Sequence, residues 1–83
     1  MQNYPNPFNP ATKIEYSLNK ASRVTLEVFD LLGRSVATLV RDEQKGAGDY
    51  SVTFAANKLA SGMYIYRLSA SGQIITKKMM LLK

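Results

Sequence analysis

Hydrophobic and polar residues alternate along most of the chain. A period of two places successive side chains on opposite faces of an extended strand, so each such run predicts a β-strand with one buried and one solvated face. Four runs show this alternation, at residues 13–18, 24–28, 49–54 and 63–68. Two less regular runs, rich in β-branched or apolar residues, also predict strands. They occupy residues 35–41 and 73–83.

Short segments rich in Gly, Asn, Asp and Ser separate these runs and predict turns. They lie at residues 19–22, 30–34, 44–48 and 71–72. Asp30–Gly33 could hold one helical turn, but no segment keeps a 3.6-residue period. Six or seven short strands at a spacing of roughly 8–12 residues are typical of a β-sandwich. We therefore expect an all-β fold of about seven antiparallel strands, with residues 57–62 crossing between the sheets.

Gly62 and Tyr64 suggest which kind of sandwich this is. The glycine stands two residues before a tyrosine that opens an alternating strand. This is the arrangement of a tyrosine corner, in which glycine permits the bend and the phenol hydroxyl bonds to upstream backbone. The motif favours an immunoglobulin-like sandwich, although Tyr64 could simply be a core aromatic.

The first ten residues differ from the rest. Three prolines within six positions push their predecessors into extended geometry and predict a stiff arm. We therefore divide the chain into a Pro-rich arm or linker boundary, residues 1–10, and an immunoglobulin-like domain, residues 11–83. We expect Tyr4 and Phe8 to dock on an edge of the sandwich, which would also protect that edge from aggregation. The arm carries the motif Asn6, Pro7, Phe8, Asn9 and Pro10.

Composition narrows the possible chemistry. The 83 residues include no cysteine and no histidine, which removes disulfides, thiolate nucleophiles, the commonest metal ligand and the usual general base. A chain of this length forms one small core. No apolar run approaches the ~20 residues of a membrane span, so we expect no membrane insertion. These features argue against an enzyme.

The net charge of +5 is confined to one part of the chain. Residues 1–57 carry six basic and six acidic residues, whereas residues 58–83 carry five basic residues and no acidic one. This asymmetry indicates either a one-sided interaction surface or the solvation of an apolar terminal strand. Nucleic-acid binding by stacking on Tyr64 and Tyr66 is not expected, because both share a face with Leu68 and that face reads as core.

Candidate catalytic and metal-binding groups are sparse. Asp42 and Glu43 are the adjacent carboxylates, and we expect them to be solvated in a loop rather than to perform acid–base chemistry on sugars. Together with Asp30 and Asp49 they could converge on a calcium ion, yet no loop has closely spaced oxygen ligands. No glycine loop of the phosphate-binding type precedes a helix. We therefore predict no catalytic residue, no metal and no cofactor.

Four short motifs occur in a fixed order, and each is unspecific alone. They are residues 4–10 (YPNPFNP), 29–34 (FDLLGR), 59–64 (LASGMY) and 77–83 (KKMMLLK). Together they closely resemble the type A C-terminal sorting domain of type IX secretion cargo. The resemblance covers essentially the whole chain and implies an immunoglobulin-like sandwich, similar also to the immunoglobulin-like domain of flagellar hook-capping proteins.

The resemblance implies a role in delivery. Domains of this family direct a parent cargo, which enters the periplasm of a Gram-negative bacterium by a signal peptide, through an outer-membrane translocon to the surface or the medium. A sortase commonly removes the domain and joins the cargo to a lipopolysaccharide. The implied partners are the translocon, the sortase and a cargo domain fused upstream. The chain shows no signal peptide, and Met1 looks like an added start codon, so we expect an excised domain.

The resemblance also assigns roles to residues. It places the start of the domain at the Asn6–Pro10 motif. It gives a structural role in turns to Asp30, Gly33, Gly62 and Tyr64. It makes the terminal strand the region read by the secretion machinery, with Lys77, Lys78, Met79, Leu81 and Lys83 as candidate recognition residues.

Two other functions remain open from the sequence. The domain could be an adhesion or carbohydrate-binding module of a secreted enzyme, although Phe29 is the one aromatic within a strand that falls clearly outside the expected core faces. It could also be a self-associating structural subunit, like the hook-cap domain.

Overall fold

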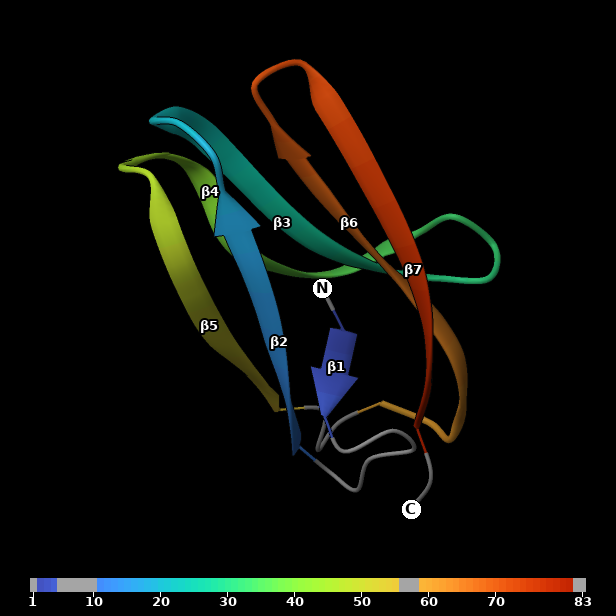
Figure 1. The fold of residues 1–83 in the computed structure, drawn as a ribbon. Helices are drawn as coiled ribbons and strands as arrows, with labels where there is room; N and C mark the ends of the chain where they lie inside the picture. Colours follow the sequence, from blue (N-terminus) through green and yellow to red (C-terminus); the bar gives the residue numbers. More distant parts are fainter. Residues whose placement is uncertain (1, 5–10, 56–58, 82–83) are drawn as a thin grey trace.

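The computed structural model describes residues 2–4, 11–55 and 59–81, and within these ranges the regular structure is entirely β (Figure 1). Six strands have eight to eleven residues and one has three. In chain order they are β1 (Gln2–Tyr4), β2 (Ala11–Leu18), β3 (Ser22–Asp30), β4 (Ser35–Lys45), β5 (Gly48–Ala55), β6 (Gly62–Ala70) and β7 (Gln73–Leu81).

The strands form two antiparallel sheets. One has the order β1-β2-β5 and the other β4-β3-β6-β7. The chain changes sheet after β2, after β4 and after β5, whereas β3–β4 and β6–β7 are hairpins within one sheet. This is an immunoglobulin-like arrangement in which the fourth strand pairs with the third, rather than with the fifth as in constant-type domains. The expected all-β antiparallel sandwich is confirmed, with six long strands and the three-residue β1 where about seven strands were expected.

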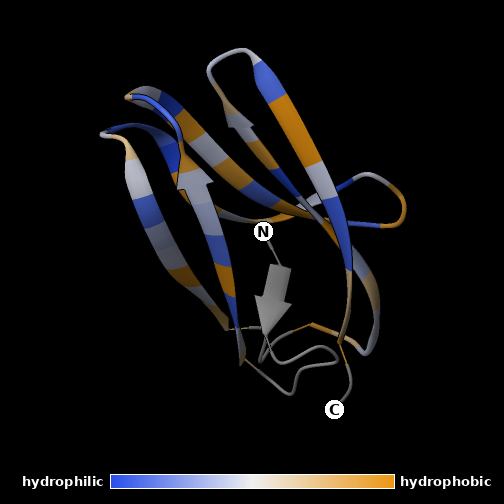
Figure 2. Cartoon of the chain, viewed as in Figure 1, coloured by the Kyte–Doolittle hydropathy of each residue, from blue (hydrophilic) through white to orange (hydrophobic). Residues whose placement is uncertain are grey.

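The core lies between the sheets. Strand alternation directs one set of side chains inward, and apolar and polar residues accordingly alternate along the ribbons in Figure 2. Every strand from β2 to β7 contributes. The buried hydrophobic residues are Ile14, Tyr16, Leu18, Val24, Leu26, Val28, Val40, Phe54, Tyr64, Tyr66, Leu68, Met79 and Leu81.

Strand β4 differs from its prediction. It runs to Lys45, four residues beyond the expected end at Arg41, so Asp42 and Glu43 lie in a strand and not in a loop. Asp42 has a positive φ of 46° and lies where the β3–β4 register is irregular. Its carboxylate accepts a 2.9 Å hydrogen bond from Nε of Arg23. Both carboxylates are exposed, as expected.

The Asp30 side chain braces the turn between β3 and β4. Its Oδ1 accepts hydrogen bonds from the backbone N–H groups of Leu32 (2.9 Å) and Arg34 (3.0 Å), and its Oδ2 accepts one from Nε of Arg34 (2.8 Å). Gly33 takes a φ of +86°, which a side chain would resist, and its N–H donates to the Asp30 carbonyl. The segment is therefore a hydrogen-bonded turn and not a turn of helix.

These donors predict how Asp30 responds to acid. They favour the charged carboxylate, the Arg34 N–H most strongly, and hold the pKa of Asp30 below its ordinary value of 3.8. A lowered folded-state pKa stabilises the fold above the unfolded pKa, and this stabilisation is lost as the pH falls through the folded pKa. We expect Asp30→Asn, whose amide oxygen keeps both backbone bonds, to lose less unfolding free energy than the parent between about pH 5 and pH 2.

Urea unfolding at a series of pH values measures this difference. Parallel profiles for the parent and Asp30→Asn would show that Asp30 does not contribute to the acid sensitivity of the domain.

Tyr64 makes the hydrogen bond that defines a tyrosine corner. Its hydroxyl donates to the carbonyl of Ala60 at 2.7 Å, and the residue is only 7% exposed. Gly62, at the start of β6, has a φ of +150° that side chains rarely adopt. The corner therefore fixes the path of the chain into the central strand β6.

Two core tyrosines have no such partner. The hydroxyls of Tyr16 and Tyr66 are buried and make no hydrogen bond with any described residue. Burial raises the pKa of both phenols, because the charged form would lose its hydration. The Tyr16 ring stacks on Tyr50 with ring centroids 5.3 Å apart. These side chains thus contribute as aromatic packing rather than through their oxygens.

Candidate interaction surface

Four of the five expected recognition residues, Lys77, Lys78, Met79 and Leu81, lie on β7, the edge strand of the four-stranded sheet. Its inner neighbour is β6, and no described strand pairs with its other edge. From Gln73 to Lys78 every residue is exposed. An edge strand offers unpaired backbone N–H and C=O groups to which another extended chain can bond. The geometry therefore makes this edge a candidate docking site.

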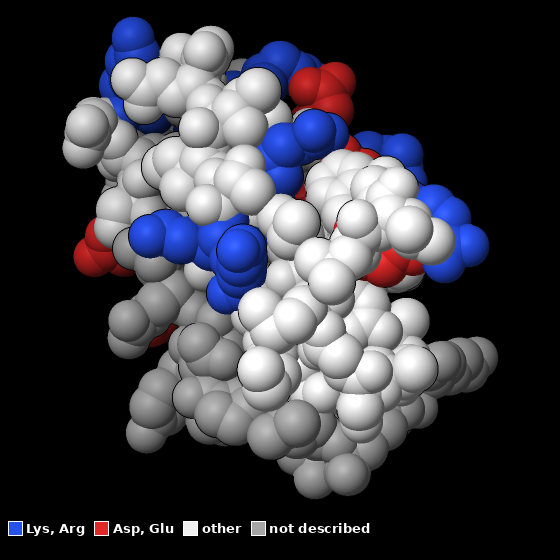
Figure 3. Space-filling view, turned by 90° about the vertical axis from the view of Figure 1, so that its right-hand side faces the viewer, with Lys and Arg blue, Asp and Glu red and all other residues white. Residues whose placement is uncertain are grey.

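The cations of this surface are Lys77, Lys78 and Arg67. No carboxylate of the described residues forms an ion pair with either lysine, whereas Arg67 contacts Glu27 at 3.5 Å and stands 4.7 Å from the centre of the Phe29 ring. Residues 62–81, which span the β6–β7 hairpin, contain three basic residues and no acidic one. Figure 3, seen from the side of β7, shows basic groups separated by broad uncharged surface.

The recognition residues fall into two groups. Lys77 and Lys78 are exposed and point to opposite faces of β7, since they are consecutive in a strand. Met79 and Leu81 are 1% and 0% exposed and belong to the core. A partner that binds the folded domain from outside can reach the lysines but not these two apolar side chains. Lys83 lies outside the described residues, as does the Asn6–Pro10 motif.

Several exposed apolar residues of the same region were missed by the sequence reasoning. Ile74 and Met80 on β7 are 65% and 40% exposed, and Leu31 and Leu32 in the braced turn are 63% and 78% exposed. The alternation of side chains along a strand predicts the exposure of Ile74 and Met80. If Met79 and Leu81 face the core, then residues 74, 76, 78 and 80 face outward. No sequence pattern predicts the exposure of Leu31 and Leu32, because it depends on how the turn projects from the sheet.

The described residues offer little other chemistry. They contain no group of three or more acidic, histidine or cysteine side chains that could hold a metal ion. None of them forms a helix long and apolar enough to span a bilayer. The described aromatic side chains are buried or half-buried, and Phe29 lies beneath Arg67. These observations define a small β-sandwich domain with an exposed, basic edge strand.

Comparison with known proteins shows the family to which the chain belongs. A family model, the secretion system C-terminal sorting domain, matches residues 2–82. The chain therefore belongs to the C-terminal sorting domains of type IX secretion, which are not an enzyme family. Neither a curated protein nor a solved structure matched it. Membership implies a cargo fused upstream, interaction with the secretion machinery, and export to the surface or the medium.

Proposed function

We propose that this domain carries its cargo through the outer-membrane translocon by presenting the β7 edge to the secretion machinery, and that a surface sortase then removes it. The observation that carries the proposal is the position of β7. The strand is exposed on its outer edge, rich in unpaired lysines, and held in place by two core side chains.

Two kinds of contact would act together at this edge. Backbone pairing between β7 and a strand of the partner supplies affinity that does not depend on sequence. Lys77 and Lys78 supply selectivity for an acidic surface, because charge complementarity chiefly determines the association rate and the choice of partner. Ile74 and Met80 lie on the same outer face as Lys78 and add apolar area to the contact.

Carbohydrate binding is less well supported. Sandwich domains often bind sugars through exposed aromatic rings, and the described aromatics are buried or half-buried. Phe29, the candidate platform, is occupied by the Arg67 guanidinium. No observation favours this alternative.

The test must separate recognition from folding. Deleting residues 77–83 would remove Met79 and Leu81 from the core, so lost delivery would not identify a recognition site. We instead propose the double variant Lys77→Glu/Lys78→Glu in a reporter fusion carrying a signal peptide, expressed in a type IX-competent cell. Two exposed charge contacts contribute about 1 kcal/mol each at most. Their loss and reversal should reduce surface delivery by about tenfold or more.

The matched control is Lys13→Glu/Arg41→Glu. Both residues are exposed, lie on β2 and β4 away from β7, and change the net charge by the same amount. The control should deliver the reporter normally, and both double variants should keep the unfolding temperature of the parent. Equal delivery by the two double variants would refute the proposal that the secretion machinery recognises Lys77 and Lys78.

A further inference from the structure

One side of the sandwich is open. β1 pairs with β2 only from Lys13 to Glu15, so no described strand covers that edge of β2 at residues 16–18. The opposite boundary of the gap is β7, whose outer edge is also unpaired. Between the two lies a groove of about 360 Å³. Most of its lining residues are polar, and the apolar ones are Leu18, Leu68, Ala70 and Ile75.

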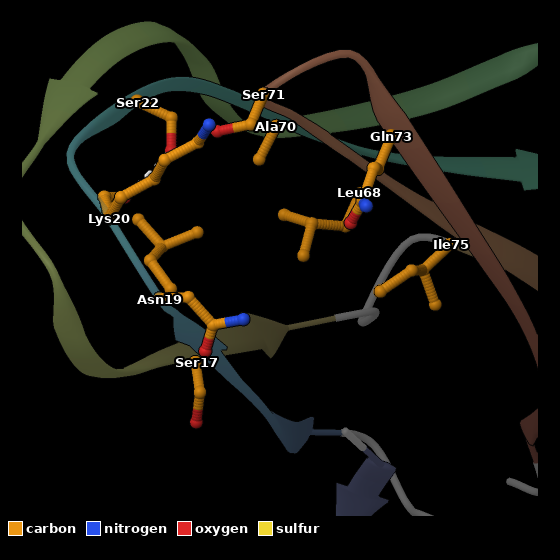
Figure 4. A pocket seen from close by; sticks show the side chains of 10 residues that line it. Ser17, Asn19, Lys20, Ser22, Leu68, Ala70, Ser71, Gln73 and Ile75 are labelled. Carbon is orange, nitrogen blue, oxygen red and sulfur yellow. Dashed lines mark hydrogen bonds between the residues drawn. The ribbon is translucent and has the colours of Figure 1, made fainter.

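The floor of this groove is core surface that lacks a cover. Ile75 shares the inward face of β7 with Met79 and Leu81, yet it is 42% exposed. Its partner across the β6–β7 pair is Leu68, which is buried. Figure 4 shows Leu68, Gln73 and Ile75 on one side of the hollow, with Asn19 and Lys20 on the other. An apolar residue inserted here would complete the core at this end.

The direction of β1 identifies what fills the gap. β1 is antiparallel to β2, with Gln2 opposite Glu15 and Tyr4 opposite Lys13. The chain upstream of β1 therefore heads along β2 toward Leu18. The uncovered edge is three residues long, roughly 10 Å at the rise of a strand. Members of this family follow a cargo domain, so in the parent protein a polypeptide enters β1 from this side.

We propose that the segment joining the cargo to this domain extends β1 along β2 and closes the groove between β2 and β7. In this register the first residue upstream of position 1 stands opposite Ser17 and the second stands opposite Leu18. Cross-strand partners share a face of the sheet. The second upstream residue therefore points into the groove toward Leu18, Leu68 and Ile75, against which an apolar side chain would pack.

The inference rests on the family assignment, which supplies the upstream cargo, but not on how the domain is delivered. It has a structural consequence for the parent protein. The junction with the cargo is held as a β-strand paired with β2 instead of hanging free. A protease that cuts extended, unpaired chain then reaches the junction only when this strand detaches or at residues further upstream.

Disulfide trapping in the parent protein, cargo included, tests the register. The described domain has no cysteine of its own, so engineered pairs can be read by peptide mapping. The test pair replaces Ser17 and the first upstream residue by cysteine. Directly opposed strand residues lie within the range that a disulfide spans. The positive control is Gln2→Cys/Glu15→Cys, which samples the observed pairing. The negative control joins the first upstream residue to Lys13→Cys, four positions out of register.

We expect the test pair to form an intramolecular disulfide as completely as the positive control, and the negative control to remain reduced. A test pair that stays reduced while the positive control closes would overturn the proposal, and so would failure of the positive control, because then β1 itself is not paired. Disulfides that form only between two molecules would show instead that a second copy occupies the groove. None of these outcomes depends on delivery, so they are independent of the lysine experiment.

Discussion

Leu81→Ala should lower the unfolding free energy of the domain by about 2–5 kcal/mol, the usual cost of a cavity left by a fully buried leucine. Leu81 is 0% exposed and pairs with Gly62 at the start of β6. A domain of this size has a total stability of roughly 4–12 kcal/mol. The expected fall in the midpoint of thermal unfolding is on the order of 10–30 °C.

Met80→Ala is the matched control for this variant. It removes a side chain of similar size from the next position of β7, but Met80 is 40% exposed on the outer face. We expect a change of about 0.5–1 kcal/mol. Delivery by Leu81→Ala should fall only as far as the domain unfolds. Normal stability combined with lost delivery would show that Leu81 is read directly by a partner, contrary to its position in the core.

Tyr64→Phe should destabilise the domain and Tyr66→Phe should not, although each removes one hydroxyl from β6. The Tyr64 hydroxyl bonds to the Ala60 carbonyl at 2.7 Å, so its loss should cost about 1–2 kcal/mol. The Tyr66 hydroxyl is buried without a described partner. Its removal relieves a desolvation penalty and should leave stability unchanged or raise it by up to about 2 kcal/mol.

Chemical unfolding of both variants beside the parent measures the contrast. Because the rings stay in place, packing is conserved and the difference between the two reports on the hydroxyls alone. Equal losses would mean that Tyr66 has a hydrogen-bond partner in solution, and equal gains would mean that the bond to Ala60 contributes nothing.

The local sequence pattern was sufficient to predict much of the fold. Alternation located the inward faces of β2, β3, β5 and β6, because a strand with one wet face must alternate. The Gly62–Tyr64 spacing pointed to the corner because that geometry depends on neighbours in sequence. These features require no knowledge of distant parts of the chain.

Features that depend on distant contacts were harder to predict. Residues 42–45 are all polar, and an edge strand that is solvated on both faces leaves no alternation to detect, so β4 was predicted too short. The terminal run has apolar residues on both faces, and only the β6–β7 register separates buried Met79 from exposed Met80. The gap beside β2 follows from how far β1 extends, which no local pattern encodes.

On the proposed function, strand β7 both completes the core and presents the lysines that the secretion machinery reads, two roles that many targeting signals keep apart. A linear signal can be read from an unfolded or damaged protein, whereas here the lysines stand on a strand that stays in place only while Met79 and Leu81 fill the core. A chain cleaved in the turn at Ser71–Gly72, or misfolded elsewhere in the sandwich, would lose the recognition surface on β7 along with its structure. Under this proposal, only a completely folded domain presents β7 to the secretion machinery, so incompletely folded cargo-bearing chains would not be exported.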